Sequence, residues 1–455
     1  MLHYKMIFKK EDELVDELFA KAPVKKVYFQ LALPVVLGMV ASMVYNLADT
    51  FFVAKTGNTA LVAGVALGTP LFSFMLAIGD IFGLGGSAVI SRLLGEKKYA
   101  LSAKISSFSL YITIAFSLLL TAIMLIFERP ILNLLGATPQ TYQYAADFYR
   151  ILVGGSVFII VSLVPGNIIR TEGLAVKSMI ATLSGTILTI ILDPLFLFVF
   201  DMGAKGIALA NVLGYAVNCG ILFYYMNRDC KILSLKLRDC QINLHNLKLV
   251  LAIGIPASLT NLMQSFGVAL LNNHLSKYGA SAVAANGIVA KIYMIVILVM
   301  VGFAFGAQPL IGYNYGAKNK KRFKEIMRFD FLVEVVYSLV LAVILMVLAP
   351  VLVKIFMTDT KIIEQGTYML RATLLTAPFV GAILVFTTVF QSAGKAWSAL
   401  IMALARQGVV YAPCMVILAN SVGYHGIIWA QPVADAVTFV IGWVLYRKVI
   451  KDFSA

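Results

Sequence analysis

Long apolar runs, separated by short clusters of charge and by glycine or proline breaks, dominate this sequence. Two of the runs, Ile105 to Phe127 and Val335 to Val353, contain no charged residue. A helix needs about 20 residues to cross the ~30 Å hydrocarbon core of a bilayer, and both runs reach that length. Because backbone in contact with lipid must satisfy its own hydrogen bonds, runs of this kind predict helices rather than strands. The pattern predicts an all-α membrane protein.

Reading every apolar run in this way predicts twelve transmembrane helices. They cover residues 27–53, 61–91, 105–127, 147–168, 178–200, 206–226, 248–275, 282–312, 327–353, 367–390, 398–419 and 425–446. The long charged connector in the middle divides them into two sets of six. The predicted organisation is a cytoplasmic N-terminal segment (1–26), an N-terminal six-helix lobe (27–227), a cytoplasmic inter-lobe linker (228–247), a C-terminal six-helix lobe (248–447) and a cytoplasmic tail (448–455).

Composition and charge placement narrow the class of protein. Hydrophobic residues make up 60% of the chain and charged residues only 13%, which excludes a soluble enzyme. The formal net charge of +15 suggests a nucleic-acid partner only if the basic residues form a patch. Instead, about 28 of the 37 lysines and arginines lie in segments that are cytoplasmic if the N-terminus is inside. We therefore expect a multi-pass protein of the plasma (inner) membrane with both termini in the cytoplasm, and no nucleic-acid binding.

Motifs for enzymatic or metal chemistry are missing from the sequence. The first twenty residues have no apolar core typical of a cleavable signal peptide, so the first helix is expected to direct insertion. The four cysteines show no paired spacing, and there is no Walker A, HExxH or GxSxG motif. We therefore expect neither an enzyme nor an ATP-driven pump, and no cofactor.

The two halves of the chain are similar to each other at a shift of roughly 220 residues. GNTALVAGVALG from Gly57 resembles GASAVAANGIVA from Gly279, and Pro34 corresponds to Pro256. Since each half has an even number of spans, both copies enter the membrane in the same orientation and should be related by a pseudo-two-fold axis along the membrane normal. In such folds the substrate binds at the repeat interface and alternating access comes from rocking one bundle against the other.

Two acids inside predicted spans are the leading candidates for ion binding, because a charge at mid-membrane is costly without a functional partner. Asp49 follows Pro34 by about four turns, and that proline can kink the helix that carries the acid. Asp193 lies at a similar depth in the fifth span. Two carboxylates brought together there would bind a proton or a monovalent cation such as sodium. The alternatives are a helix-packing hydrogen bond for Asp49 and an interfacial position for Asp193.

Other polar residues in the spans are candidates for lining a cavity. They are Asn46, Asp80, Gln264, Lys291, Gln308 and Asp435. Glu334 is expected near the membrane interface, at the start of the ninth span. The abundant aromatic and methionine residues could line an adaptable chamber for flat cationic ligands, although most are expected to be ordinary core.

Several segments taken in order resemble one known family. They are LALPVVLGMVASMVYNLADTFFVAKTGN, FGLGGSAVISRLLGEKK, IRTEGLAVKSM, ILDPLF with GIALANVLG, FQSAGKAWSALIMALARQ and WAQPVADAVT. Together they resemble the multidrug and toxic compound extrusion (MATE) family over nearly all of the chain after residue ~27. The resemblance implies a twelve-helix, two-lobed antiporter that exports organic cations and other drugs in exchange for protons or sodium ions.

The same resemblance implies roles for individual residues. Asp49 and Asp193 match the acids of the family's ion-binding cluster in the N-terminal lobe, and Pro34 matches its kinking proline. Thr189 and Asn211 fall at the other polar ligands, with Tyr149 nearby. Where one branch of the family has an acid in the seventh span, this chain has Gln264, which favours coupling through the N-terminal lobe.

The predicted function is therefore secondary active multidrug efflux by alternating access, with small-molecule drugs as substrates and no obligate protein partner. A lipid-linked saccharide flippase of similar architecture is one alternative, and a non-transporting receptor or channel scaffold is another. The drug spectrum, the choice between H⁺ and Na⁺, the stoichiometry and the oligomeric state stay open at this stage, because protons and sodium use the same carboxylates.

Overall fold

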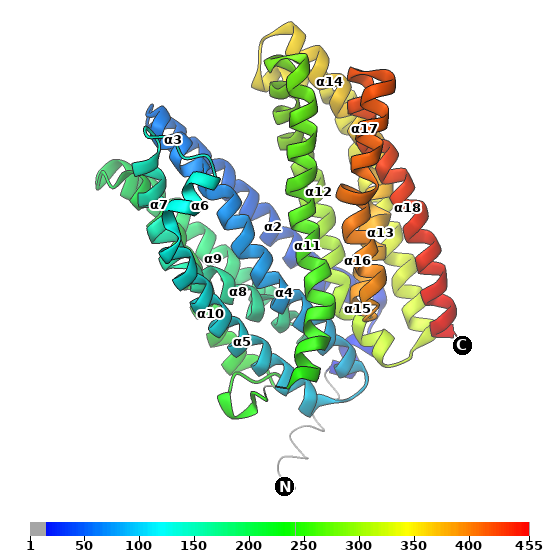
Figure 1. Ribbon diagram of the computed structural model, residues 1–455. Helices are drawn as coiled ribbons and strands as arrows, with labels where there is room; N and C mark the ends of the chain where they lie inside the picture. The colour runs from blue at the N-terminus through cyan, green and yellow to red at the C-terminus, as the bar shows by residue number, and fades with distance from the viewer. Residues whose placement is uncertain (1–14, 242, 455) are drawn as a thin grey trace. The chain divides into compact units, whose positions relative to one another are not determined.

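A computed structural model describes residues 15–241 and 243–454, and these residues form helices and connecting turns without a strand (Figure 1). Ten helices are long and apolar enough to cross a membrane. Two further helix pairs, each bent at a short break, pass the same test together and bring the number of spans to twelve. The prediction of an all-α, twelve-span membrane protein is confirmed on this count.

The first half of the chain contains η1 (Glu17–Lys21), α2 (Val24–Lys55), α3 (Thr59–Ala66), α4 (Gly68–Gly95), α5 (Tyr99–Ile126), α6 (Glu128–Leu134), α7 (Tyr142–Gly154), α8 (Ser156–Ile168), η2 (Ile169–Glu172), α9 (Ala175–Pro194), η3 (Leu195–Val199), α10 (Gly203–Asp229) and η4 (Leu237–Asp239). The second half contains α11 (Leu244–Leu275), η5 (Ser276–Tyr278), α12 (Ala280–Gly316), α13 (Lys320–Phe356), α14 (Thr360–Leu375), α15 (Ala377–Ser392), α16 (Ala396–Leu404), η6 (Ala405–Val409), α17 (Tyr411–Val422) and α18 (Tyr424–Ser454).

The internal duplication is visible in the backbone geometry as well as in the sequence. The two bent pairs are α7 with α8 and η2, and α14 with α15, and their bends are 46° and 45°. Left-handed backbone recurs at the same shift: Lys97 has φ 59° and Lys318 has φ 53°. Gly173 (φ 85°) and Gly394 (φ 71°) repeat it after the bent pairs. A residue other than glycine rarely adopts positive φ. Positive φ at two equivalent lysines therefore indicates that both turns derive from the same duplicated segment.

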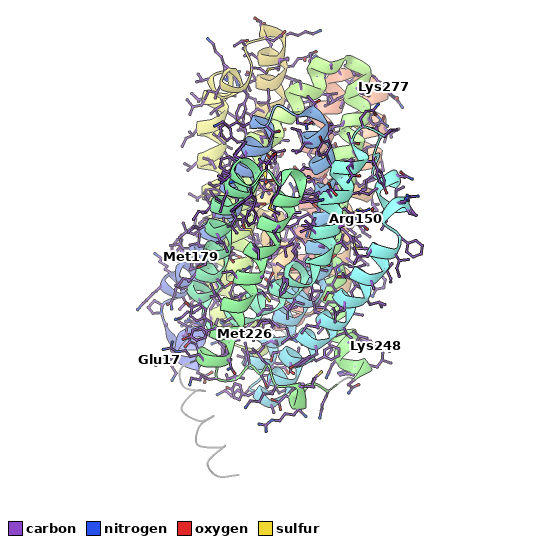
Figure 2. The ribbon with its side chains drawn as sticks, turned by 90° about the vertical axis from the view of Figure 1, so that its left-hand side faces the viewer. Glu17, Arg150, Met179, Met226, Lys248 and Lys277 are labelled. Carbon is purple, nitrogen blue, oxygen red and sulfur yellow. The ribbon has the colours of Figure 1, made fainter. Side chains whose placement is uncertain are left out.

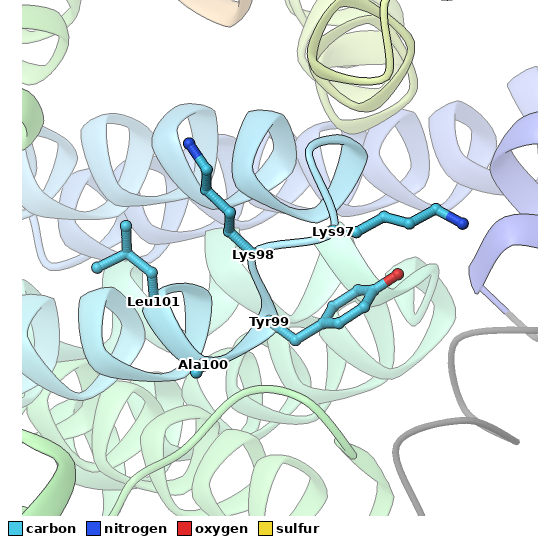
Figure 3. Close-up of a pocket in the computed structure, with 5 residues that line it drawn as sticks. All are labelled: Lys97, Lys98, Tyr99, Ala100 and Leu101. Carbon is cyan, nitrogen blue, oxygen red and sulfur yellow. The ribbon is translucent and has the colours of Figure 1, made fainter. Parts of the chain in front are cut away.

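At the first of these turns, between α4 and α5, the side chains of Lys97 and Lys98 point in different directions (Figure 3). The Lys97 ammonium lies 3.0 Å from Asp16, and that of Lys98 lies 2.7 Å from Glu96. Exposed ion pairs of this kind contribute little to stability. The turn is therefore set by the backbone, and its lysines contribute charge to the membrane-flanking segment.

The chain divides into two compact units, and the division falls inside two helices. Of the described residues, unit 1 contains 15–22 and those from 37 to 254, and unit 2 contains 23–36 and 255–454. The long helices α2 and α11 therefore each change unit part-way along. Pro34 and Pro256 lie within two residues of the two divisions. Since proline removes a backbone donor and weakens the helix locally, each helix changes unit at a turn that is intrinsically easy to bend.

Helix α13 shows how sequence pattern decides what is buried. Its exposed residues include Leu332, Val336, Leu339, Val343 and Val347, which recur at helical spacing and form an apolar, lipid-facing stripe. The opposite stripe is buried in unit 2 and contains Asp330, Glu334, Ser338, Ala342 and Ala349. The apolar stripe thus turns two acids inward, so that Glu334 is buried among the helices of unit 2, while its expected depth near the membrane interface stays a prediction.

Close helix crossings within each unit depend on glycine. In unit 2 a Cβ added to Gly306 of α12 would lie 2.3 Å from the Cα of Ala32 in α2, and one added to Gly302 would lie 2.8 Å from the Cα of Val36. In unit 1 a Cβ on Gly254 would lie 1.8 Å from the carbonyl oxygen of Ile81. Small residues are typical of close helix contacts in membrane proteins.

We expect Gly306→Ala to destabilise unit 2, and Gly287→Ala in the same helix to leave stability unchanged or slightly raised. Overpacking costs ~1–3 kcal/mol, which exceeds the ~1 kcal/mol that alanine gains over glycine in a helix. A Cβ on Gly287 meets nothing within 4 Å, so only the gain applies there. The thermal midpoints of the two purified variants measure the difference, and equal midpoints would contradict the close crossing.

The segment after α10 is held to unit 1 by side chains that form hydrogen bonds with its backbone. The Glu172 carboxylate accepts hydrogen bonds from the amides of Lys231, Ile232 and Leu233 at 2.7–2.9 Å. Hydroxyl groups of α5 donate hydrogen bonds to the backbone carbonyls of residues 234–236. The Ser107 hydroxyl, for example, donates to the Lys236 carbonyl at 2.7 Å. Burial raises the pKa of the Cys230 and Cys240 thiols in this segment, so both are expected to stay protonated and unreactive.

We expect Glu172→Ala to release this segment, because three backbone amides lose their acceptor at once. Each buried donor left unsatisfied costs ~1–3 kcal/mol, although water reaches part of this exposed turn and reduces the total. Limited proteolysis between residues 228 and 241 measures the release. Glu96→Ala, at the exposed α4–α5 turn, is the control and should keep the wild-type cleavage rate; if Glu172→Ala is cleaved no faster, the anchoring role is refuted.

Candidate ion-coupling site

The site is built on the close packing of α9 against α10 in unit 1. A Cβ on Gly185 of α9 would lie 2.5 Å from the carbonyl oxygen of Gly214 in α10, and a Cβ on Gly214 would lie 2.0 Å from the Thr189 hydroxyl. Only glycine allows this approach. It places the last two turns of α9, with Thr189 and Asp193, beside the middle of α10.

Three polar side chains from three helices meet at this crossing. The Thr189 hydroxyl donates to the Gly185 carbonyl at 3.0 Å and lies 3.5 Å from the Ala210 carbonyl. The Asn211 side chain donates to the Ile207 carbonyl at 3.0 Å and accepts a hydrogen bond from the Tyr45 hydroxyl of α2. The Tyr45–Asn211 bond therefore attaches the part of α2 that carries Asp49 to α10.

The two predicted acids lie next to this network. Asp193 is 1% exposed, and neither of its carboxyl oxygens has a hydrogen-bond partner among the described residues. Asp49 is half-buried, and its Oδ1 is also without a partner there. The two carboxyl groups are close enough to interact electrostatically, and both act on the Tyr45 hydroxyl. The structure thus brings together Asp49, Asp193, Thr189 and Asn211.

Such a pair has a defined chemistry. Two ionised carboxylates removed from water repel each other, and a charge without a partner in a low-dielectric interior is costly. The described part of the chain forms no salt bridge to either acid. A proton or a small monovalent cation is the simplest group that would neutralise the pair, and three unpaired oxygens are available to bind it.

The other candidates in unit 1 lie in different surroundings. The Asn46 side chain donates to the carbonyl of Ser42 in its own helix at 2.8 Å. Tyr149 is buried in the apolar core, where its hydroxyl donates to the Met124 carbonyl at 2.6 Å rather than to either acid. Its neighbour Arg150, labelled in Figure 2, forms a two-point pair with Glu128, with both N–O distances 2.8 Å. Asp80 of α4 interacts electrostatically with Arg170 and Tyr215.

Comparison with known proteins gives the site its context. The sequence profile of the MatE family matches residues 34–195 and 256–417. The chain belongs to this family. It is 30% identical over 440 residues to the multidrug export protein MepA of Staphylococcus aureus (strain MRSA252), a match that covers 96% of this chain and 97% of the relative.

Two crystal structures of a MATE protein, described as its straight and its bent conformation, share the fold of this chain. Each is 25% identical, with TM-scores of 0.91 and 0.90; the matches cover 97% and 98% of this chain and 98% of each solved chain. The predicted family is therefore confirmed, and the chain is a multi-pass membrane transporter rather than an enzyme. The two profile matches also begin 222 residues apart, which agrees with the duplication.

In unit 2 of this MATE protein, Asp435 belongs to a compact polar network. Asp435 is 1% exposed and lies 3.1 Å from Arg406, whose side chain is 17% exposed. Gln431 donates to the same carboxylate at 2.9 Å, and Thr376 donates to its other oxygen at 3.3 Å. Every oxygen of this acid is thus satisfied, unlike those of Asp193.

The remaining candidates in unit 2 lie apart from that network. Gln264 and Lys291 are exposed on α11 and α12. Gln308 is buried, its backbone carbonyl accepts from the Ser392 hydroxyl at 3.2 Å, and its side-chain nitrogen has no partner in the described structure.

Sequence reasoning missed Tyr45 and Arg406. Tyr45 lies four residues before Asp49 on the same helical face, and that spacing was the available signal. Arg406 lies inside the predicted span 398–419, but it was counted with the membrane-flanking basic residues because it is close to the cytoplasmic start of that span. The π-helical turn η6 (Ala405–Val409) carries this arginine, and such turns often mark functional positions.

Proposed function

We propose that this MATE transporter is a secondary active multidrug efflux antiporter that exports organic cations and related drugs in exchange for protons or sodium ions by alternating access. The observation that carries the proposal is the buried pair of Asp49 and Asp193 with its unpaired oxygens. The similarity to a multidrug export protein over nearly the whole chain supports drugs as the substrates.

In the proposed cycle the acid pair alternates between two states. Without a bound ion, the two carboxylates repel each other and favour separation of α2 from α9. With a proton or sodium ion bound, the repulsion is lost and the helices pack, while the Tyr45–Asn211 hydrogen bond keeps α2 in register with α10. Pro34, at the point where α2 changes unit, supplies the flexible turn for this change. Of the two ions, we favour protons.

The setting of this cycle is the plasma (inner) membrane, with both termini in the cytoplasm. The density of lysine and arginine in the loops assigned to the inside supports this orientation. Export then means movement from the side of the termini to the opposite side. The ion is a transported solute, and no cofactor takes part.

Transport of a fluorescent organic cation in proteoliposomes, with and without an imposed pH or sodium gradient, tests the function. We expect cation movement that depends on one of the two ion gradients. Movement that ignores both gradients would indicate a channel, and no movement of the cation under any gradient would leave the flippase or receptor as the better account. Either result would refute the proposal.

A further inference from the structure

Unit 2 contains a second buried acid pair, which the proposed cycle does not use. Asp330 and Glu334 lie one helical turn apart on the inward stripe of α13, and both are 0% exposed. Three of their four carboxyl oxygens, Oδ2 of Asp330 and both oxygens of Glu334, make no well-formed hydrogen bond in the described part of the chain, and only the backbone of Ala304 in α12 acts weakly on Glu334. The two groups interact electrostatically.

The one satisfied oxygen of the pair is bound from the first turns of α2. The Tyr28 hydroxyl donates to Oδ1 of Asp330 at 2.8 Å, although the two residues are 302 positions apart. Tyr28 is fully buried; its ring packs on Phe303 at 6.4 Å between centroids and meets Phe329 edge-on at 5.1 Å. Residues 23–36, which belong to unit 2, are thus held there by the Tyr28–Asp330 hydrogen bond and by aromatic packing, in addition to the close crossing on Gly302 and Gly306.

Among the described residues, no lysine, arginine or histidine forms an ion pair with Asp330 or Glu334. The titratable groups that act on it are three tyrosines: Tyr28 on α2, Tyr337 on α13 itself and Tyr446 on α18. Helix α15 packs against α13 and has no titratable residue. From α14, Arg371 reaches α13 only at the Met346 carbonyl, which is twelve residues or ~18 Å of helix beyond Glu334. The lysine of α12, Lys291, is exposed.

These surroundings favour a proton over a metal ion as the ligand. Two ionised carboxylates here would be buried, adjacent and unpaired, which is the most costly arrangement for charged groups. A bound metal cation would require several oxygen ligands beyond the pair itself, and the rings of Phe303, Phe329 and Phe331, which pack on the nearby tyrosines, supply none. A proton on one carboxyl removes the repulsion and needs no further ligand, and the two groups then titrate as a pair.

We propose that Asp330 and Glu334 form a second proton-binding site, and that the proton it holds keeps residues 24–36 of α2 docked within unit 2 through Tyr28. Loss of the proton leaves two adjacent buried charges. Water that enters to hydrate them competes with the Tyr28 hydroxyl for Asp330 and loosens the packing of residues 24–36. This site is separate from Asp49 and Asp193. Its protonation controls the docking of residues 24–36 even when no drug and no ion gradient are present.

Hydrogen exchange of residues 24–36, measured by mass spectrometry on the full-length protein in lipid nanodiscs, tests this site. After correction for the intrinsic pH dependence of exchange, we expect wild-type protection to fall as pH rises. The fall approaches about tenfold per pH unit if one proton is released on opening. In Asp330→Asn/Glu334→Gln the neutral side chains cannot repel each other, so protection should stay constant with pH.

Matched variants separate titration of the pair from general destabilisation. Glu325→Gln removes an exposed acid of the same helix and should behave as wild type. Glu334→Gln alone keeps the Tyr28–Asp330 bond, and its protection should depend on pH less steeply than in wild type. A wild-type pH dependence in the double variant would overturn the proposal, as would protection that depends on sodium concentration instead of pH.

Infrared spectroscopy supplies a second test that does not require altering the pair. In Asp49→Asn/Asp193→Asn, which retains Asp330 and Glu334, we expect the carbonyl band of a buried protonated carboxyl to disappear over the same pH range as the protection. Absence of this band from the folded protein would overturn the inference, whatever the outcome of the transport assays.

Discussion

Asp193→Asn is expected to abolish ion-driven export of an organic cation by this transporter while leaving the protein folded. Asparagine keeps the size of the side chain but cannot exchange a proton or balance a cation. The wild-type carboxyl is buried with both oxygens unpaired, so no existing hydrogen bond is lost in the substitution. Loss of ~1.4 kcal/mol of coupling free energy lowers the gradient-dependent rate of export about tenfold. Complete loss of the ion site lowers that rate further.

Transport under an imposed gradient, compared at equal protein abundance, measures this effect. Asp49→Asn should give a similar loss. With only one carboxylate left, the repulsion that is proposed to separate α2 from α9 is absent. Asp201→Asn is the matched control: it lies eight residues from Asp193 in the same unit, but it is exposed. If Asp193→Asn exports the cation as fast as the control Asp201→Asn, the acid pair does not couple export to the ion gradient.

Arg406→Gln is expected to cause the largest loss of stability of any single polar substitution considered. Asp435 is 1% exposed and depends on Arg406 for charge compensation. Removing one partner of a buried ion pair leaves the other charge unpaired in a low-dielectric interior, at a cost of ~3–5 kcal/mol. Hydrogen bonds from Gln431 and Thr376 reduce this cost only in part, because they carry no net charge.

The double variant Arg406→Gln/Asp435→Asn separates the unpaired charge from lost packing. If the charge is the cause, the double variant should recover most of the unfolding free energy lost in Arg406→Gln. Arg129→Gln, an exposed arginine in unit 1, is the control for loss of a guanidinium group. A double variant no more stable than Arg406→Gln would show that shape rather than charge dominates the network.

Hydropathy was sufficient to predict the spans, because apolar length is a direct requirement of the bilayer. Their internal breaks were harder to predict. The bends of 46° and 45° in the fourth and tenth spans fall at Gly155 and at Thr376, where no charged residue interrupts the run and only a glycine pair or a nearby proline marks the break. Likewise, the predicted lobes kept each helix whole, whereas the compact units divide α2 and α11 next to Pro34 and Pro256. A proline signals a weak turn but does not say which neighbours each side will pack against.

The acid pair of unit 1 was predictable because two acids at matching depth are rare in a membrane. Their neighbour Tyr45 was not predicted, since a tyrosine in a span is usually a packing residue. Asp330 was missed, and the burial of Glu334 was not predicted, for a related reason. Both acids lie close to the basic cluster at the start of α13. Only the apolar, lipid-facing stripe on the opposite side of the helix shows that they point inward.

Drug-driven ion movement in proteoliposomes tests the central claim most directly. A gradient of a fluorescent organic cation is imposed with no ion gradient, and trapped dyes record protons or sodium ions moving the opposite way. We expect the wild-type protein to move one of these ions against the flow of the cation. Asp49→Asn/Asp193→Asn should still bind the cation but move neither ion. Ion movement in this double variant at the wild-type rate would contradict the account.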